Sequence, residues 1–263
     1  MDLAALNTQF ENEGFLDKPT LLYQKGDHAI YWIGVVEETA FRCNVYLIKA
    51  GKDVILVDPG NRNFFENVKA RVAQITDPSN VTGMIICHQD PDVGASMVDW
   101  LDFKPDITVF TSPRTNVLLP YFGVNAYTFY DVVEKPEYQC DSGEVLRFVE
   151  APFLHFPGAF TTFDLSAGYL FSGDVWAALD IDWNLVVEDF DEHVMALDLF
   201  HKDYMASNIA ARGFVNRIRD LDIRAILPQH GSIIIGNDVP KALEYLNNLK
   251  CGLDIIYPEL GNG

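Results

Sequence analysis

Residues 82–92 read Thr-Gly-Met-Ile-Ile-Cys-His-Gln-Asp-Pro-Asp, an apolar run that ends in a histidine and two aspartates. The apolar part predicts a short buried strand. His88, Asp90 and Asp92 then alternate along an extended segment, and Pro91 restricts the backbone between the two carboxylates. Side chains spaced in this way can offer ligands to two neighbouring metal ions rather than to one.

The same pattern, an apolar strand followed closely by His or Asp, recurs along the chain. A strand predicted over 53–58 ends in Asp58, the segment 151–158 carries His155, a strand over 168–172 leads into Asp174, and a strand over 224–228 leads into His230. One such residue alone would be read as a turn or cap residue. Loops at the carboxyl ends of strands line the ligand crevice of open α/β sheets. Five strand ends with His or Asp therefore predict one convergent site.

The remaining pattern mixes strands and helices from end to end, which indicates the α/β class. Further strands are predicted over 28–34, 43–49, 107–111 and 144–149, and helices over 63–75, from near Gly94, from Pro113, over 191–220 with a break near Gly213, and over 239–249. No linker rich in Pro, Gly or Ser interrupts the sequence. We therefore expect a single domain over residues 1–263.

The composition excludes several classes of function. The formal net charge is −19, so the Lys/Arg footprint that a nucleic acid or an anionic membrane requires is missing. No apolar run is long enough for a membrane span, and the start lacks the basic and apolar regions of a signal peptide, so a cytoplasmic location is expected. The four cysteines form no CxxC pair and are expected to be buried, reduced thiols.

This set of residues resembles the metallo-β-lactamase fold, whose signature is an Asp after an early strand, an HxHxDH-type loop, then His, Asp and His. The resemblance covers about residues 28–240 and implies an αβ/βα sandwich. Asp58 resembles the structural Asp of that family, which braces the metal loop and does not bind metal. The remaining motif positions match His88, Asp90, Asp92, His155, Asp174 and His230.

Asp90 separates the chain from zinc hydrolases of this fold, which carry His there. Flavodiiron proteins carry a carboxylate at this position, and 151–158 and 171–176 resemble their stretches around His155 and Asp174. A carboxylate in place of imidazole favours iron or manganese over zinc. The resemblance implies two irons and the following ligands: His88, Asp90 and His155 on iron 1, Asp92 and His230 on iron 2, and a bridging Asp174. The last His of the loop motif is replaced by Val93, so iron 2 is expected to keep an open position.

Flavodiiron enzymes continue into a flavodoxin domain that holds FMN, but only residues 231–263 follow His230. No FMN is therefore expected in this chain. The combination resembles stand-alone oxygen-binding di-iron proteins associated with bacterial chemotaxis. Their function implies dioxygen as the ligand and a chemotaxis or signalling protein as the partner. Flavodiiron relatives form head-to-tail dimers, so a homodimer is allowed, although the missing flavin domain removes the reason for one.

Two enzymatic alternatives stay open. The first is an O2 or NO reductase that receives electrons from a separate donor, and the second is a binuclear metallo-hydrolase, against which Asp90 argues. Phe156 and Trp176 stand next to ligand positions and are candidates for the pocket wall, although core packing explains them equally well. His193 and His201 are more simply read as a solvated helix face, and His28 as a satisfied histidine.

Overall fold

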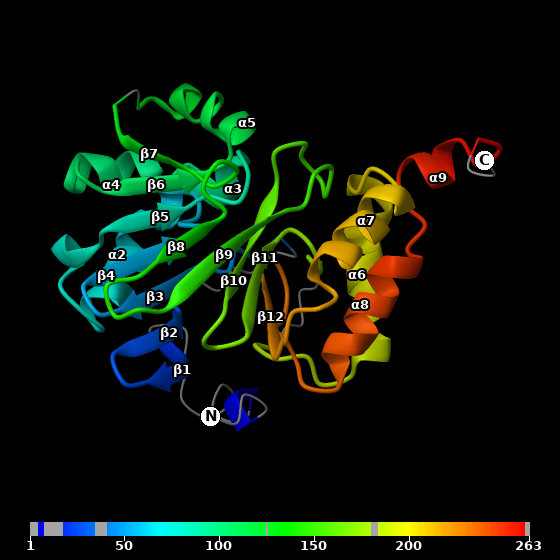
Figure 1. Cartoon of the computed structure of the whole chain (residues 1–263), viewed down its shortest axis with the longest axis horizontal. Helices are drawn as coiled ribbons and strands as arrows, with labels where there is room; N and C mark the ends of the chain where they lie inside the picture. Colours follow the sequence, from blue (N-terminus) through cyan, green and yellow to red (C-terminus); the bar gives the residue numbers. More distant parts are fainter. Residues whose placement is uncertain (1–4, 8–17, 35–40, 125, 180–183, 261–263) are drawn as a thin grey trace.

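The computed structural model describes residues 5–7, 18–34, 41–124, 126–179 and 184–260. These residues form two mixed β-sheets that pack face to face, with helices on both outer faces (Figure 1). The predicted αβ/βα sandwich is confirmed. Within the described residues, no helix is long and apolar enough to cross a membrane.

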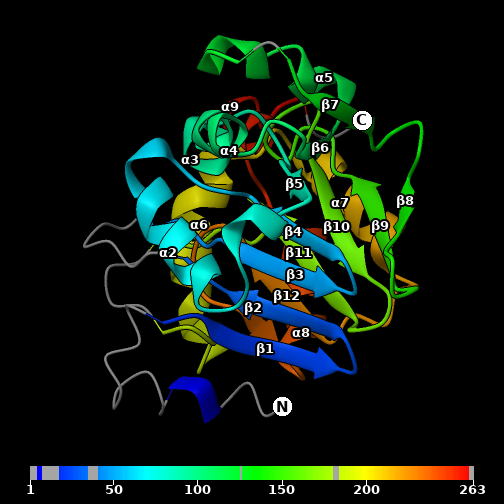
Figure 2. The ribbon, with the colours of Figure 1, turned by 90° about the vertical axis from the view of Figure 1, so that its left-hand side faces the viewer.

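The first sheet has the order β1-β2-β3-β4-β5-β6-β7. Its strands are β1 Thr20–Lys25, β2 His28–Trp32, β3 Tyr46–Ala50, β4 Asp53–Val57, β5 Gly83–Ile85, β6 Thr108–Thr111 and β7 Thr128–Asp131. Strands β1 to β4 pair antiparallel and β4 to β7 parallel. The parallel half brings the carboxyl ends of β4 and β5 to one edge of the sheet (Figure 2).

The second sheet has the order β13-β12-β11-β10-β9-β8. Its strands are β8 Glu137–Gln139, β9 Val145–Glu150, β10 Phe160–Asp164, β11 Tyr169–Gly173, β12 Ala225–Pro228 and β13 Ile234–Ile235. Strands β11 and β12 run parallel, so Asp174 and His230, which follow them, start from the same end of this sheet.

Helical segments cover the outer faces of both sheets. Those in the first half are η2 Arg62–Phe64, α2 Phe65–Ala73, η3 Pro78–Asn80, α3 Pro91–Gly94, α4 Met97–Phe103, α5 Pro113–Asn116 and η4 Leu119–Phe122. Those in the second half are α6 Phe190–Tyr204, α7 Asn208–Ile218, α8 Asp238–Asn248 and α9 Leu253–Ile256. In Figure 1, α2 and α4 lie outside the first sheet, and α6, α7 and α8 outside the second.

The central strands of both sheets are buried on both faces, and the side chains of a strand alternate between two apolar clusters. In β3, Tyr46 and Ile48 join the cluster between the sheets, whereas Leu47 joins the cluster under α2 and α4. In β11, Phe171 faces the space between the sheets, whereas Leu170 packs under the helices of the second half. This alternation explains why these strands read as continuous apolar runs.

Two sequence expectations are corrected by the structure. The helix predicted over 191–220 breaks at residues 205–207, between α6 and α7, and not near Gly213. The Ser207 hydroxyl caps α7 by accepting a hydrogen bond from the Ala210 N–H, while Gly213 lies inside that helix. The sequence pattern also missed the strands β1, β7, β8, β10 and β13.

Candidate metal centre

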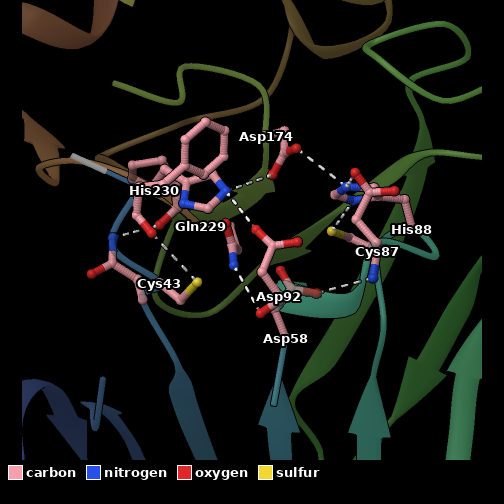
Figure 3. Close-up of polar contacts among 12 residues, drawn as sticks. Cys43, Asp58, Cys87, His88, Asp92, Asp174, Gln229 and His230 are labelled. Atoms are coloured by element: carbon pink, nitrogen blue, oxygen red, sulfur yellow. Dashed lines mark hydrogen bonds and ion pairs between the residues drawn. The ribbon is translucent and has the colours of Figure 1, made fainter. Parts of the chain in front are cut away.

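All six predicted metal ligands meet where strand ends of the two sheets face each other. Figure 3 labels four of them, His88, Asp92, Asp174 and His230. They fall into two clusters of donors, in each of which the ligand atoms lie within 4.8 Å of one another. The first group is His88, Asp90, His155 and Asp174, and the second group is Cys43, Asp92 and His230. The second group contains one residue that the sequence analysis did not select, Cys43.

The first group is a tight arrangement of two imidazoles and two carboxylates. Oδ2 of Asp174 lies 3.2 Å from His88 Nε2 and 3.0 Å from His155 Nε2. Oδ2 of Asp90 lies 3.6 Å and 3.4 Å from the same two nitrogens. Four donors of hard and borderline character therefore face one small volume, as a metal site requires.

The second group is centred on His230, whose Nε2 lies 3.1 Å from Asp92 Oδ2. The other oxygen of Asp174, Oδ1, lies 3.8 Å from this same nitrogen. One carboxylate thus has one oxygen toward each group, which is the geometry expected of a bridging ligand.

The hydrogen bonds of His230 test whether a metal fits here. Its Nδ1 lies 2.7 Å from the carbonyl oxygen of Arg42, which can only accept, so Nδ1 carries the proton and donates. In the neutral imidazole, Nε2 then has a bare lone pair. This nitrogen is buried, has no hydrogen-bond partner and faces the carboxylate of Asp92. With Nε2 bare, these two acceptors need a positive charge between them. In the metal-free protein a proton supplies it, because burial is outweighed by the carboxylate of Asp92, which holds the pKa of His230 well above its usual range. A metal ion can take the same place, so the donor set fits a metal.

Burial and charge act together on the titratable groups of the first group. Burial opposes protonation of His155, but the hydrogen bonds and charges of Asp174 and Asp90 outweigh it and raise the pKa of His155 to about 9. Burial also opposes ionisation of Asp174, yet the surrounding histidines hold the pKa of its carboxyl well below the usual range. Without a metal, protons on the histidines thus balance the carboxylates.

Asp58 follows β4 and supports the loop that carries His88. Its buried Oδ1 accepts a hydrogen bond of 3.0 Å from the backbone N–H of Cys87, the residue before His88. Burial raises the pKa of Asp58 to about 6, although the hydrogen bonds from Cys87 oppose that shift. Asp58 belongs to neither group of donors, as expected for a bracing residue.

Gly173 lets the chain turn from β11 into Asp174. Its φ of +57° lies in the left-handed region. A Cβ at this position would lie only 2.7 Å from the sulfur of Cys87. A glycine is therefore required both by the backbone conformation and by the close approach of the neighbouring strand end.

The predicted role of Trp176 in the pocket wall is corrected. Its ring is fully buried in the apolar cluster under α6, α7 and α8, where Nε1 donates to the carbonyl oxygen of Ala242. His201 is also buried rather than solvated: its Nε2 accepts from the Trp176 N–H at 2.9 Å, and Nδ1 lies 2.9 Å from Leu197 O. His201 can lie in the apolar core because both of its ring nitrogens have hydrogen-bond partners.

Other aromatic rings border the two groups. Phe41 lies edge-on to His230 with ring centres 4.6 Å apart, and Phe200 and Tyr204 lie 5.9 Å and 6.0 Å from His155. Phe200 and Tyr204 stack on each other at 4.6 Å. These residues come from α6 and the segment before β3, and no local sequence pattern relates them to the ligands.

The role of Phe156 in the pocket wall and the open metal position next to Val93 stay predictions. Phe156 is half-buried, and its ring lies 3.0 Å from the position of a Cβ on Gly158. Val93 is fully buried in the apolar cluster under α2 and α4, so it adds no donor next to Asp92. His28 is buried too, with Nε2 2.8 Å from Asp164 Oδ2, away from both groups of donors.

Comparison with known proteins assigns the family. The family described as ODP family beta lactamase matches residues 41–231, which includes every residue of both groups. This chain belongs to the ODP family of beta-lactamase-like proteins.

Solved structures agree with this assignment. The apo state of the chemotaxis sensor ODP from T. denticola superposes with a TM-score of 0.82 and 29% identity, covering 92% of this chain and 98% of that one. A structure described as the peroxy diiron species of chemotaxis sensor ODP gives the same TM-score and identity, and covers all of that chain.

Curated relatives are longer. A putative diflavin flavoprotein A 1 of Nostoc sp. is 28% identical over 196 residues, which are 73% of this chain and 33% of that protein. An anaerobic nitric oxide reductase flavorubredoxin of Enterobacter sp. is 26% identical over 155 residues, 57% of this chain and 31% of that protein. The ODP-family chain thus spans about a third or less of the length of these relatives.

Proposed function

We propose that this ODP-family protein holds two iron ions, binds dioxygen between them and acts as an oxygen sensor for a signalling partner. The observation that carries the proposal is the carboxylate of Asp174, which has one oxygen toward each group of donors. Two metal ions that share this ligand would be close enough to bind one diatomic molecule together.

The proposed ligands follow the two groups. His88, Asp90 and His155 would hold iron 1, Asp92 and His230 would hold iron 2, and Asp174 would bridge. Three imidazoles and three carboxylates form a set that suits iron, since the carboxylate of Asp90 in place of an imidazole hardens the ligand set. When bound as iron(II), the pair would supply the two electrons that dioxygen accepts on binding.

Aromatic side chains would lie beside the place where the oxygen molecule binds. The ring of Phe41 borders His230, and the ring of Phe200 borders His155. The phenyl rings of Phe41 and Phe200 have no proton to donate, and they cover part of the surface of these imidazoles. Such surroundings favour binding over reduction to water.

The likeness to a chemotaxis sensor over almost its entire length favours a sensor. The second candidate is an O2 or NO reductase with a separate electron donor, which the likeness to a nitric oxide reductase flavorubredoxin favours. A metallo-hydrolase is the weakest alternative, because Asp90 replaces the imidazole of zinc enzymes. The sensor function requires a signalling protein that reads the oxygen-bound state.

An anaerobic oxygen titration tests the proposal. The protein is expressed with iron, purified without air, reduced, and analysed for metals before stepwise addition of dioxygen. We expect two irons per chain and a visible absorption band that saturates at one dioxygen per iron pair. Rapid catalytic oxygen or NO consumption with reduced rubredoxin would favour the reductase. Two zinc ions together with ester hydrolysis would overturn the iron proposal.

A further inference from the structure

The buried thiol of Cys43 lies against the second group of donors. Its sulfur is within 4.8 Å of ligand atoms of both Asp92 and His230. In Figure 3 the sulfur points toward the space beside these two residues. Cys43 is only 7% exposed, and its sulfur lies 4.0 Å from the carbonyl oxygen of Phe41, at the outer limit of a hydrogen bond to sulfur.

The position of this thiol is fixed by the segment that carries it. The Asn44 side chain donates to the carbonyl oxygens of Pro228 at 2.9 Å and Gly231 at 2.8 Å, on either side of His230. The Asn44 N–H donates to the Gln229 carbonyl at 2.6 Å, and His230 Nδ1 donates back to Arg42 O. Cys43 is therefore held beside His230 by hydrogen bonds from both of its neighbours.

A second observation indicates that a ligand belongs in the same space. His230 Nε2 is completely buried and has no hydrogen-bond partner, although Asp92 Oδ2 lies 3.1 Å away. The lone pair of this nitrogen, the carboxylate and the sulfur are three donors around one point. Nitrogen, oxygen and sulfur donors gathered in this way form a set of ligands that metal ions bind in proteins.

We propose that Cys43 is a protein ligand of the second metal ion, bound through its thiolate sulfur. On binding, the thiol releases its proton to solvent and the sulfur donates an electron pair to the metal. Together with Asp92, His230 and Asp174, it gives this ion four protein ligands, as many as the first group offers. This inference rests on the proposed two-metal site. The Cys43 sulfur would be a soft ligand of the second ion, to which Val93 offers no donor atom.

The consequence is an asymmetric pair of metal sites. The first ion has only nitrogen and oxygen ligands, whereas the second also has sulfur. A thiolate ligand gives a metal with a partly filled d shell an intense charge-transfer absorption that nitrogen and oxygen ligands do not give. Cobalt(II) is a suitable probe because it occupies mixed nitrogen, oxygen and sulfur sites without needing dioxygen.

The test is an anaerobic cobalt(II) titration of the full chain, followed by near-ultraviolet absorption. We expect a sulfur-to-cobalt charge-transfer band that grows only with the second equivalent or in proportion to occupancy of the second site. In Cys43→Ala the band should be lost, and affinity for the second ion should fall about tenfold or more, since even outer partners of a ligand contribute that much. Cys43→Ser should also lose the band while keeping a weaker oxygen ligand.

Two control variants separate Cys43 from the other thiols. Cys140→Ala removes a buried thiol far from both groups, and Cys87→Ala removes the one that lies 3.1 Å from His88 Nδ1. Both should keep the band. Wild-type protein with two bound cobalt ions and no such band, a band that survives in Cys43→Ala, or a single bound ion without a band would each overturn the assignment.

These outcomes are distinct from a failure of the proposed function. A charge-transfer band that depends on Cys43, combined with an iron form that does not react with dioxygen, would leave the ligand assignment intact and remove the sensor function. Two bound ions without a sulfur band would remove the ligand and leave the oxygen-binding proposal standing.

Discussion

Asp174 Oδ1 lies 3.8 Å from His230 Nε2, while Oδ2 of the same carboxylate lies against the histidines of the first group. This contact connects the two clusters of donors, each of which contains residues from both sheets. Asp174 follows β11 of the second sheet, whereas His88 and Asp92 follow β5 of the first. The site therefore forms only when both sheets have packed.

Removal of the shared carboxylate should affect both metal ions. We expect Asp174→Ala to lose both ions on desalting, because each group loses a ligand and the two metal charges lose the anion between them. Asp92→Ala is the matched comparison, since Asp92 belongs to the second group only. That variant should keep about one ion per chain. Metal analysis by mass spectrometry decides, and an Asp174→Ala protein that retains one ion would contradict bridging.

Asp58 should stabilise the metal-free protein through its hydrogen bond to the Cys87 N–H. Asp58→Ala leaves this buried donor unpaired, which costs about 1–3 kcal/mol in the free energy of unfolding. Asp58→Asn keeps an acceptor oxygen and should lose less. Urea unfolding in the presence of a chelator measures both. Equal stability of Asp58→Ala and wild type would show that water replaces the carboxylate.

Gly173→Ala should destabilise the turn that positions Asp174. The left-handed φ costs an alanine about 1–2 kcal/mol, and the added Cβ would meet the Cys87 sulfur at 2.7 Å. Gly213→Ala is the control, because Gly213 lies on the exposed face of α7 with open space around it. There the same change should stabilise by about 0.5–1 kcal/mol. Thermal unfolding compares the two; a stabilising effect at both positions would contradict the argument for Gly173.

His201 should make the protein sensitive to acid. Burial lowers the pKa of His201 to about 4, below its ordinary value of 6.5. A group with a depressed pKa in the folded state contributes stability above its unfolded pKa and loses that contribution as the pH falls, here between about 6.5 and 4. Between pH 7 and pH 5 the loss should be roughly 2 kcal/mol.

His201→Gln isolates this effect, because the glutamine oxygen can accept the Trp176 N–H without titrating. The unfolding free energies of wild type and variant are measured with chelator from pH 7 to pH 5. Their difference removes the pH dependence that comes from the other titratable groups, because both proteins share it. We expect the wild type to lose more stability than the variant. Parallel pH curves would show that the imidazole does not titrate in this range.

The residues that form the two groups of donors, apart from Cys43, could be predicted from the sequence because each follows an apolar strand within a few residues. The strand pattern of 82–87 and the polar residues after it are local, and so are those around Asp174 and His230. Cys43 could not be predicted in this way, since hydrogen bonds between Asn44 and residues 228–231 bring it to the site.

The sequence pattern also did not show which aromatic side chains border the two groups of donors. Trp176 is adjacent to the ligand loop in sequence, yet its ring is directed into the helical layer, where Nε1 finds the Ala242 carbonyl. Phe200 and His201 are neighbours on α6, but one borders His155 and the other bonds the backbone of Trp176. Residue spacing alone does not determine which face of a helix meets a site formed by distant strands.

The central claim is that one carboxylate joins two irons into a single unit. Mössbauer spectroscopy of the anaerobically purified, iron-57-loaded protein in an applied magnetic field measures this most directly. The account predicts two irons per chain in distinct environments that behave as one spin-coupled pair. A single iron site, or two irons that respond to the field as isolated ions, would contradict it.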